Sequence, residues 1–261
     1  MFDLGTSFLA SVARDPHAVA IVDGDVRLTY AEWYERISGL VAGLEKMGLA
    51  PGDHVLTLLQ NRWENATLHW ACQFAGLIVT PLNWRAKGDE IDYAIENAGA
   101  KAVFFEALTA PAVAESALAS GLPCIEADGA VFAGMMNAGG EAARPRATAE
   151  SWSLMLYTSG TTSKPKGVPR RHRAERAAAI AHVAQNQYAH GEVTLGVMPL
   201  YHTMGVRSLI AMSLIGGTFV CLPRFDVEGA LSLIAREKVT NLYLVPTLYH
   251  DLVHHPAFET T

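Results

Sequence analysis

The 261-residue sequence predicts an α/β protein with a doubly wound, largely parallel sheet. Short apolar runs, typical of buried strands, alternate along the chain with longer segments in which apolar residues recur at helical spacing. Half of the residues are hydrophobic and 18% are charged, a composition typical of packed globular proteins and not of disordered or fibrous ones. Strands separated by helices form parallel βαβ units, so we expect helices to cover the sheet.

The first predicted element is a helix that begins with a capping box. Thr29 and Glu32 occupy the capping positions, and apolar residues then recur at helical spacing as far as Gly48, which suits a left-handed cap. Strands and helices are then expected to alternate. The strands are 54–59, 77–80, 102–105 and 123–126, and the helices are 61–74, 89–97 and 110–119.

Helical and strand periodicity disappears over residues 127–150, which predicts a surface connection. We expect a boundary here between a first α/β part, 1–150, and a second, 151–261, although the earliest elements could pack with the later part. Beyond this connection the strands are expected at 152–157, 194–198, 218–222 and 241–245, and the helices at 173–189, 206–215 and 226–238.

Charge and cysteine content exclude several classes of function. Twenty basic and 26 acidic residues give a formal charge of −6, which argues against a partner such as nucleic acid or an anionic membrane. The cysteines Cys72, Cys124 and Cys221 are odd in number and far apart, so neither a disulfide framework nor a zinc site is indicated. The sequence shows neither a secretory signal nor a membrane span, and we expect a cytoplasmic location.

The segment 157–168 has an unusual composition. It reads Tyr-Thr-Ser-Gly-Thr-Thr-Ser-Lys-Pro-Lys-Gly-Val, with hydroxyl groups on six of its first seven side chains. Placed between a predicted strand and a predicted helix, such a turn can wrap backbone N–H groups and hydroxyls around phosphate oxygens, while lysine adds positive charge. A polar surface turn is the alternative, but the ordered string favours phosphate binding. Neither a standard P-loop nor a G-x-G-x-x-G motif is present.

This segment resembles the phosphate-binding signature of the adenylate-forming superfamily, which includes acyl- and aryl-CoA synthetases, luciferases and adenylation domains of peptide synthetases. That signature runs Thr-Ser-Gly-Thr-Thr-Gly-x-Pro-Lys-Gly, and the chain departs from it at Ser163, where glycine would give more backbone freedom. Residues 198–205, Met-Pro-Leu-Tyr-His-Thr-Met-Gly, look like the second core signature. Shorter runs at 29–32, 52–55 and 79–83 follow the N-terminal region of the superfamily.

The resemblance implies Rossmann-like subdomains and an acid–thiol ligase. In such enzymes a carboxylate attacks the α-phosphorus of Mg-ATP, and a thiol, usually that of CoA, then displaces AMP. The implied phosphate-binding residues are Thr158, Ser159, Gly160, Thr161, Thr162 and Lys166. The implied acyl pocket comprises His202, Thr203, Met204, Gly205 and Val206. Lys166 and His202 are the expected catalytic residues, with a buried structural histidine as the alternative for His202 and an ordinary core position as the alternative for Val206.

The ligands implied by the resemblance are ATP, Mg²⁺, CoA and a small carboxylic acid. Aromatic or cyclic acids of the benzoate or 2-furoate type are favoured, fatty acids remain open, and a homodimer is plausible for the superfamily. Later motifs of the superfamily, such as its ribose-binding Asp and the catalytic Lys of its small domain, have no match here. We therefore expect an N-terminal portion of a ligase that is by itself an incomplete catalyst. Loading of a carrier-protein thiol and a non-catalytic nucleotide-binding module are the alternatives.

Two further clusters, one of basic residues and one of histidines, are interpreted as surface features without a role in catalysis. The basic run 169–173 is expected to be a solvated helix start, with pyrophosphate or CoA binding as the weaker hypothesis. His250 and His254 form an i, i+4 pair, but no H-E-x-x-H motif is present, so surface histidines are favoured and no protein metal site is expected.

Overall fold

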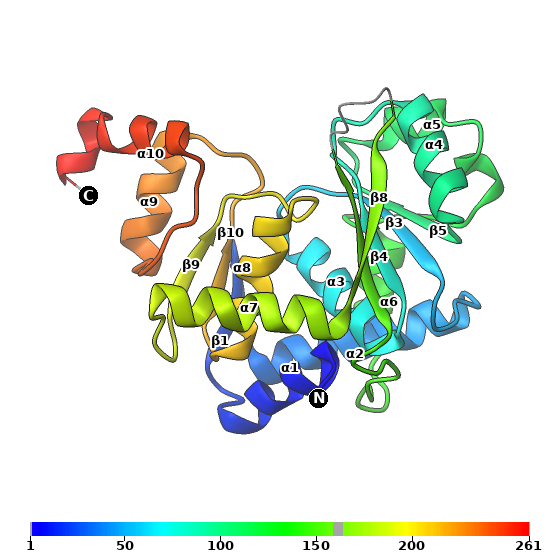
Figure 1. The fold of residues 1–261 in the computed structure, drawn as a ribbon, viewed down its shortest axis with the longest axis horizontal. Helices are drawn as coiled ribbons and strands as arrows, with labels where there is room; N and C mark the ends of the chain where they lie inside the picture. The colour runs from blue at the N-terminus through cyan, green and yellow to red at the C-terminus, as the bar shows by residue number, and fades with distance from the viewer. Residues whose placement is uncertain (1, 159–163, 261) are drawn as a thin grey trace. The chain divides into compact units, whose positions relative to one another are not determined.

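The computed structural model describes residues 2–158 and 164–260, and the chain divides into two compact units (Figure 1). The first unit comprises Met1–Ser7, Tyr34–Leu59 and Glu64–Ala177, and the second comprises Phe8–Trp33, Gln60–Trp63 and Ala178–Thr261. Each unit is therefore assembled from separate stretches of the chain. Residue 150 lies inside the first unit.

The first unit is built on a six-stranded sheet. Its strands, in the order β6-β5-β3-β4-β7-β8, are Cys124–Glu126, Ala102–Phe105, His54–Leu58, Ile78–Pro81, Trp152–Thr158 and Lys166–Arg171. All neighbouring pairs are parallel except β7 and β8, which are antiparallel. The β4 strand is buried at all four positions, as expected for a parallel strand covered on both faces. The associated helices are α2 (Tyr30–Lys46), α3 (Trp63–Ala75), α4 (Gly88–Ala98), α5 (Ala110–Glu115) and α6 (Ala130–Asn137).

The second unit is built on a four-stranded sheet. Its strands, in the order β2-β1-β10-β9, are Val26–Thr29, Val19–Asp23, Thr218–Cys221 and Val193–Gly196. The β1 strand pairs in parallel with β10, about 200 residues away in sequence, so early and late parts of the chain share one sheet. The remaining α-helices are α1 (Leu4–Arg14), α7 (His172–Asn186), α8 (Thr203–Leu214), α9 (Val227–Glu237) and α10 (Pro246–Val253).

The predicted α/β class is confirmed, and the first predicted helix shows how local sequence specifies it. The backbone N–H of Thr29 donates to Glu32 Oε2 at 2.8 Å, and the N–H of Glu32 lies 3.3 Å from Thr29 Oγ1. This is the reciprocal capping box that the sequence predicts at the start of α2. The apolar side chains of Trp33, Ile37 and Leu40 are fully buried along that helix.

Four segments differ from the prediction. The first 29 residues contain α1, β1 and β2, which the sequence pattern leaves unassigned. The stretch 127–150 contains α6, whose buried face consists only of Phe132 and Met136 and is too short to show periodicity. The predicted strand 241–245 makes a single bridge, from Asn241 to Thr194. Residues 166–171 form the edge strand β8, in which Pro169 is tolerated because an edge strand needs fewer backbone donors.

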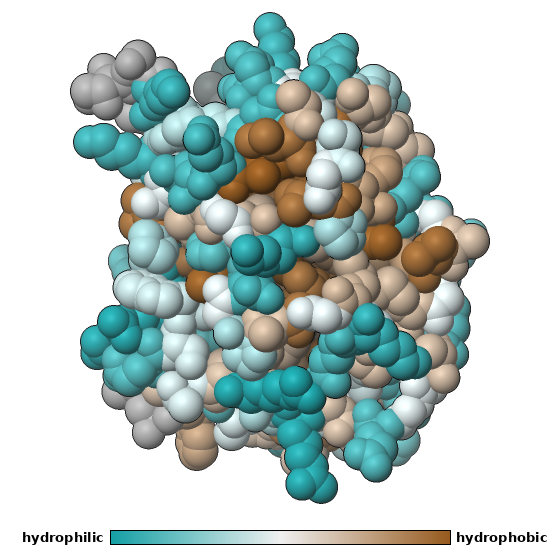
Figure 2. All heavy atoms as spheres, turned by 90° about the vertical axis from the view of Figure 1, so that its right-hand side faces the viewer, coloured by the Kyte–Doolittle hydropathy of each residue, from teal (hydrophilic) through white to brown (hydrophobic). Residues whose placement is uncertain are grey.

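Figure 2 shows the side of the molecule that carries α4 and α5, where hydrophobic side chains lie in small groups separated by hydrophilic ones. Leu108 and Leu118, near α5, are among the exposed large hydrophobic residues. No helix in the described ranges has both the length and the apolar character needed to cross a bilayer. The three cysteines are free thiols.

Two buried histidines in the first unit give stability a specific pH dependence. His69 on α3 and His172 at the start of α7 are both buried, and the His172 Nδ1 atom accepts a hydrogen bond from the N–H of Leu4 at 3.2 Å. Burial lowers the pKa of His69 to about 3 and that of His172 to about 4. In the unfolded chain both rings titrate near their ordinary pKa of about 6.5, so the unfolded state binds more protons between these values.

We therefore expect the contribution of these two histidines to the free energy of unfolding to be constant above about pH 7 and to fall as the pH decreases from 6.5 toward 4. The slope is at most about 1.4 kcal/mol per pH unit for each histidine. Urea unfolding at a series of pH values measures it. His69→Gln should flatten the profile, whereas His254→Gln, which changes an exposed ring, should not. Equal slopes in the unaltered chain, His69→Gln and His254→Gln would contradict the assignment of this pH dependence to the buried histidines.

Candidate functional site

The β7–β8 hairpin holds the two described ends of the predicted phosphate loop. Thr158, the last residue of β7, pairs with Lys166, the first residue of β8. Directly opposed residues of antiparallel strands have Cα atoms about 4.5–5.5 Å apart and side chains on the same face. The exposed hydroxyl of Thr158 and the exposed ammonium group of Lys166 therefore lie next to each other, at the edge of the sheet where the parallel strands end. Ser159, Gly160, Thr161 and Thr162 lie outside the described residues.

The surroundings of this loop differ from the expected strand-to-helix turn. The loop joins two antiparallel strands, and α7 begins only at His172. Lys166 and Arg171 are five strand steps apart, which corresponds to about 17 Å. The N-terminal dipole of α7 therefore acts too far away to attract a phosphate at the loop. Binding there depends on the hydroxyl groups, the lysine and the backbone of the loop itself.

The helix α4 anchors the chain on both sides of the loop. The Tyr93 hydroxyl donates to the Pro165 carbonyl oxygen at 2.7 Å, and the Tyr157 hydroxyl donates to Asn97 Oδ1 at 3.0 Å. The ammonium group of Lys164 lies 5.2 Å from the centre of the Tyr93 ring, within the range of a cation–π contact. Burial, with a further contribution from Tyr93, raises the pKa of Tyr157 to about 12, so its hydroxyl remains a donor at neutral pH.

Sequence reasoning missed Tyr93 and Asn97 as parts of this region. They lie four residues apart in a predicted helix and therefore on one face, which is the only signal that the sequence carries for a joint role. Their partners are Pro165, directly before β8, and Tyr157, within β7, which lie 72 and 60 residues later in the chain, so only tertiary structure brings them together.

His202 occupies the capping position before α8. Its backbone is extended (φ −114°, ψ 148°), and its exposed ring lies 4.6 Å from the ring of Tyr201. This exposure does not fit the alternative of a buried structural histidine. Neighbouring protein atoms shield this solvent-accessible ring from part of the surrounding water, and this desolvation lowers the pKa of His202, so the imidazole is neutral at pH 7 and can accept a proton or a hydrogen bond.

The other predicted acyl-site residues divide into two kinds. Gly205 and Val206 are buried, and a Cβ atom on Gly205 would lie 2.2 Å from Pro199 O and 2.4 Å from Met198 O. Glycine at this position therefore lets α8 pack directly on the preceding segment. Thr203 and Met204 are only partly buried.

Asn61 fixes the backbone that leads to His202, and sequence reasoning missed this role. Its side-chain amide donates to Gly196 O at 2.7 Å and Met198 O at 2.8 Å, and its Oδ1 atom accepts from the N–H of Leu200 at 3.0 Å. The buried amide of Asn61 thus holds the backbone of residues 196–200, at the end of β9, in one conformation. No local pattern around residue 61 could indicate contacts with residues more than 130 positions away.

A cavity of about 280 Å³ lies in the second unit. The α7 helix contributes Ala178, Ala181, His182, Gln185 and Asn186, and Arg207 of α8 and Tyr243 complete the lining. The rings of His182 and Tyr243 meet edge to face, with centroids 5.1 Å apart. Burial, followed by the positive charge of Arg207, lowers the pKa of His182, so this ring is neutral at pH 7. The volume is slightly below the range typical of ligand pockets, about 300–1,000 Å³.

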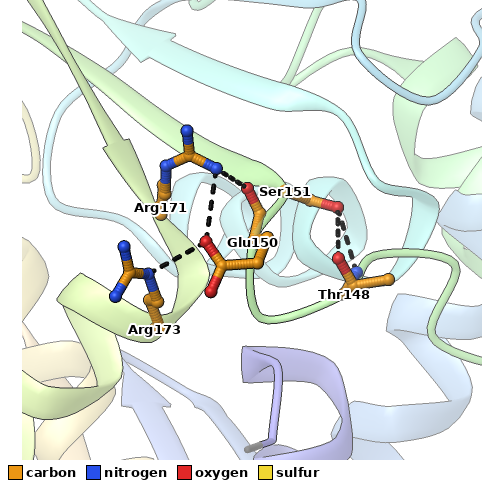
Figure 3. A network of polar contacts seen from close by, with 5 residues as sticks. All are labelled: Thr148, Glu150, Ser151, Arg171 and Arg173. Atoms are coloured by element: carbon orange, nitrogen blue, oxygen red, sulfur yellow. Dashed lines mark hydrogen bonds and ion pairs between the residues drawn. The ribbon is translucent and has the colours of Figure 1, made fainter.

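The basic run 169–173 has structural partners at the base of the hairpin (Figure 3). Arg171 donates to the Glu150 carbonyl oxygen at 2.6 Å and lies 4.4 Å from the centre of the Trp152 ring, while Arg173 Nε lies 3.1 Å from Glu150 Oε2. Because Arg171 pairs with Trp152 and Lys166 pairs with Thr158, these arginines lie at the opposite end of the hairpin from the phosphate loop. This arrangement favours the interpretation of the basic run as the start of a helix, held in place by ion pairs with Glu150.

The pair His250 and His254 lies on the surface of α10, as predicted. The two rings stack with centroids 4.0 Å apart, and both are exposed. Among residues 2–158 and 164–260, no group of three or more His, Cys, Asp or Glu side chains is arranged to hold a metal ion.

Comparison with known proteins identifies the family. Residues 8–261 match the family described as AMP-binding enzyme. The chain belongs to the AMP-binding enzyme family. It is similar to feruloyl-CoA synthase of Amycolatopsis sp., with 31% identity over 98% of this chain and 51% of that protein. It is also similar to long-chain-fatty-acid–CoA ligase FadD13 of Mycobacterium tuberculosis, with 26% identity over 90% of this chain and 47% of that protein.

Solved structures of AMP-binding enzymes show the same fold. The N-terminal domain of FACL13 from Mycobacterium tuberculosis superimposes with a TM-score of 0.91 and 25% identity, covering 99% of this chain and 67% of that one. ATP-bound MatB from Rhodopseudomonas palustris gives a TM-score of 0.85 and 28% identity, covering 98% of this chain and 52% of that one. The chain spans about half the length of the curated relatives it matches. The resemblance inferred from the phosphate-loop signature is thereby confirmed.

The contacts of α4 lead to a prediction for Tyr93→Phe. Removing the hydroxyl leaves the ring under Lys164 but releases the carbonyl of Pro165, at a cost of about 1 kcal/mol in the free energy of unfolding. We expect the backbone amides at the start of β8 to exchange faster with deuterated solvent.

Tyr34→Phe is the matched control, because the Tyr34 hydroxyl also donates to a carbonyl oxygen, that of Ala143 at 2.6 Å, away from the loop. Its stability loss should be similar while exchange at Lys166 and Gly167 stays unchanged. If both variants alter exchange there equally, the effect on Tyr93 is a general loosening and not a local release.

Proposed function

We propose that this chain supplies the nucleotide- and acid-binding part of an ATP-dependent acid–CoA ligase. The observation that carries the proposal is the cross-strand pair Thr158–Lys166, which presents a hydroxyl and an ammonium group at the carboxyl edge of the sheet. Ligands of open α/β sheets bind at that edge. Membership of the AMP-binding enzyme family and similarity to several CoA ligases support the same activity.

The candidate residues of each unit are assigned separate roles in forming an acyl-adenylate. The ammonium group of Lys166 and the hydroxyl of Thr158 offset negative charge on the β- and γ-phosphates of ATP, which favours departure of pyrophosphate. Neutral His202, at the start of α8, borders the path of the acid and the thiol, and Thr203 and Met204 contact the acid. Asn61 and Gly205 position this segment through the backbone.

The formation of an acyl-adenylate also requires the substrates and the metal ion that we propose for this chain. ATP provides the α-phosphorus that the carboxylate attacks, and Mg²⁺ is held largely by the phosphates, since such hard cations prefer oxygen ligands. CoA is the proposed thiol, and a small aromatic or cyclic carboxylic acid is the proposed substrate. The similarity to a feruloyl-CoA synthase and to a 2-succinylbenzoate–CoA ligase supports an aromatic acid. The proposal includes a cytoplasmic location and a homodimer.

Replacement of Lys166 tests the phosphate site. Lys166→Ala should weaken binding of MgATP to this chain by about 10- to 100-fold, because hydrogen bonds to charged groups contribute about 1.5–3 kcal/mol. Isothermal titration calorimetry measures the dissociation constant. Lys164→Ala is the control, because that ammonium group contacts the Tyr93 ring, and its effect should be less than about threefold.

Acid-dependent ATP–pyrophosphate exchange tests the reaction itself. Exchange reports adenylation without requiring CoA, and benzoate, 2-furoate, ferulate and a medium-chain fatty acid are offered separately. Exchange with an aromatic acid supports the proposed substrate class, and exchange with the fatty acid alone replaces it. ATP binding without exchange for any acid would agree with the expectation that this chain is by itself an incomplete catalyst, and the acid would then be sought with a longer protein.

A further inference from the structure

The cavity between α7, α8 and Tyr243 contains a cation that lacks a carboxylate partner. Arg207 is partly buried, and its guanidinium contacts the sulfur of Met204 at 3.8 Å. Within the described part of the chain, no Asp or Glu pairs with it. A guanidinium withdrawn from water without a partner is unfavourable, and an anionic ligand group would compensate it with paired hydrogen bonds.

The rest of the lining suits a flat ring. Ala178 and Ala181 leave space beside α7, while the buried His182 ring and the partly buried Tyr243 ring present aromatic surfaces. The side chain of Asn186 donates to the His182 backbone oxygen at 2.8 Å, which holds the wall of the cavity in place. The lining includes no acidic residue, so its charge is positive. Aromatic surfaces next to one cation indicate a planar anion.

Arg207 also lies in line with the predicted acyl site. It follows Thr203 by four residues and Met204 by three, so all three side chains share one face of α8. One helical turn, about 5.4 Å, separates the His202 end of this face from Arg207. A ring that occupies the cavity can thus direct one substituent toward His202 and another toward Arg207.

We infer that the cavity selects a ring carboxylic acid with a second carboxylate, and that Arg207 is its specificity-determining residue. This inference rests on the proposed function, since the carboxylate near His202 is the one to be activated. The second carboxylate forms a bidentate ion pair with the guanidinium, and the ring lies against His182 and Tyr243. An acid without the second carboxylate leaves Arg207 unpaired and binds more weakly.

Terephthalate and benzoate form the matched pair of probes, because they differ by the second carboxylate. In the presence of MgATP, we expect terephthalate to bind this chain about 10- to 100-fold more tightly than benzoate, as measured by calorimetry. Arg207→Met keeps much of the apolar stem and removes the charge. It should abolish the preference while changing benzoate affinity by less than about threefold.

Thermal unfolding provides a second readout. Without acid, Arg207→Met should be at least as stable as the unaltered chain, because an unpaired charge is removed, and terephthalate should no longer raise its Tm. Arg224→Met, which alters an exposed arginine of the same unit, should retain the terephthalate preference.

The outcomes separate this inference from the proposed function. Equal affinity for the two acids, no terephthalate binding, or a preference that persists in Arg207→Met overturns the role of Arg207. Loss of the preference in Arg224→Met as well would show a non-specific charge effect and would also overturn it. The proposed function stands or falls separately, on Lys166-dependent binding of MgATP.

Discussion

The antiparallel pairing of β8 with β7 is the constraint on which the proposed nucleotide site depends. It extends an otherwise parallel sheet by one strand and places Lys166 opposite Thr158. The register therefore sets the positions of the two groups that are to meet a phosphate, because a shift of one residue would turn one side chain to the other face. The same pairing places Arg171 at the far end of the hairpin, where Arg171 and Arg173 both form ion pairs with Glu150.

Around this hairpin, the supporting contacts come from helices that carry no phosphate-binding motif. Tyr93 and Asn97 on α4 hold the residues on either side of the loop, and their hydrogen bonds go to Pro165 and Tyr157. These hydrogen bonds fix the ends of β7 and β8 next to the loop. The loop signature thus suggests the proposed chemistry, while α4 holds the strand ends that carry Thr158 and Lys166.

In the second unit, the segment that contains His202 is likewise held by contacts from residues outside its motif. A single buried amide, that of Asn61, makes three hydrogen bonds to the backbone between residues 196 and 200. Gly205 then allows α8 to pack against that segment, since any side chain would meet the carbonyl oxygens of Met198 and Pro199. With the helix fixed in this way, Thr203, Met204 and Arg207 share a defined face of α8, which is the face assigned to the acid in the proposed function.

By itself, the sequence determined the α/β class, most strands and helices and the family, and it is the source of the proposal that the segment 157–168 binds phosphate. These features depend on local periodicity, capping residues and short motifs, such as the Thr29–Glu32 box that the structure confirms. Only the tertiary structure decided that β8 is a strand, that β1 joins β10, and that Tyr93, Asn61 and Arg207 lie where they do. The reason is physical: strand pairing and cavity lining join residues that are far apart in the chain, and no local pattern encodes those partners.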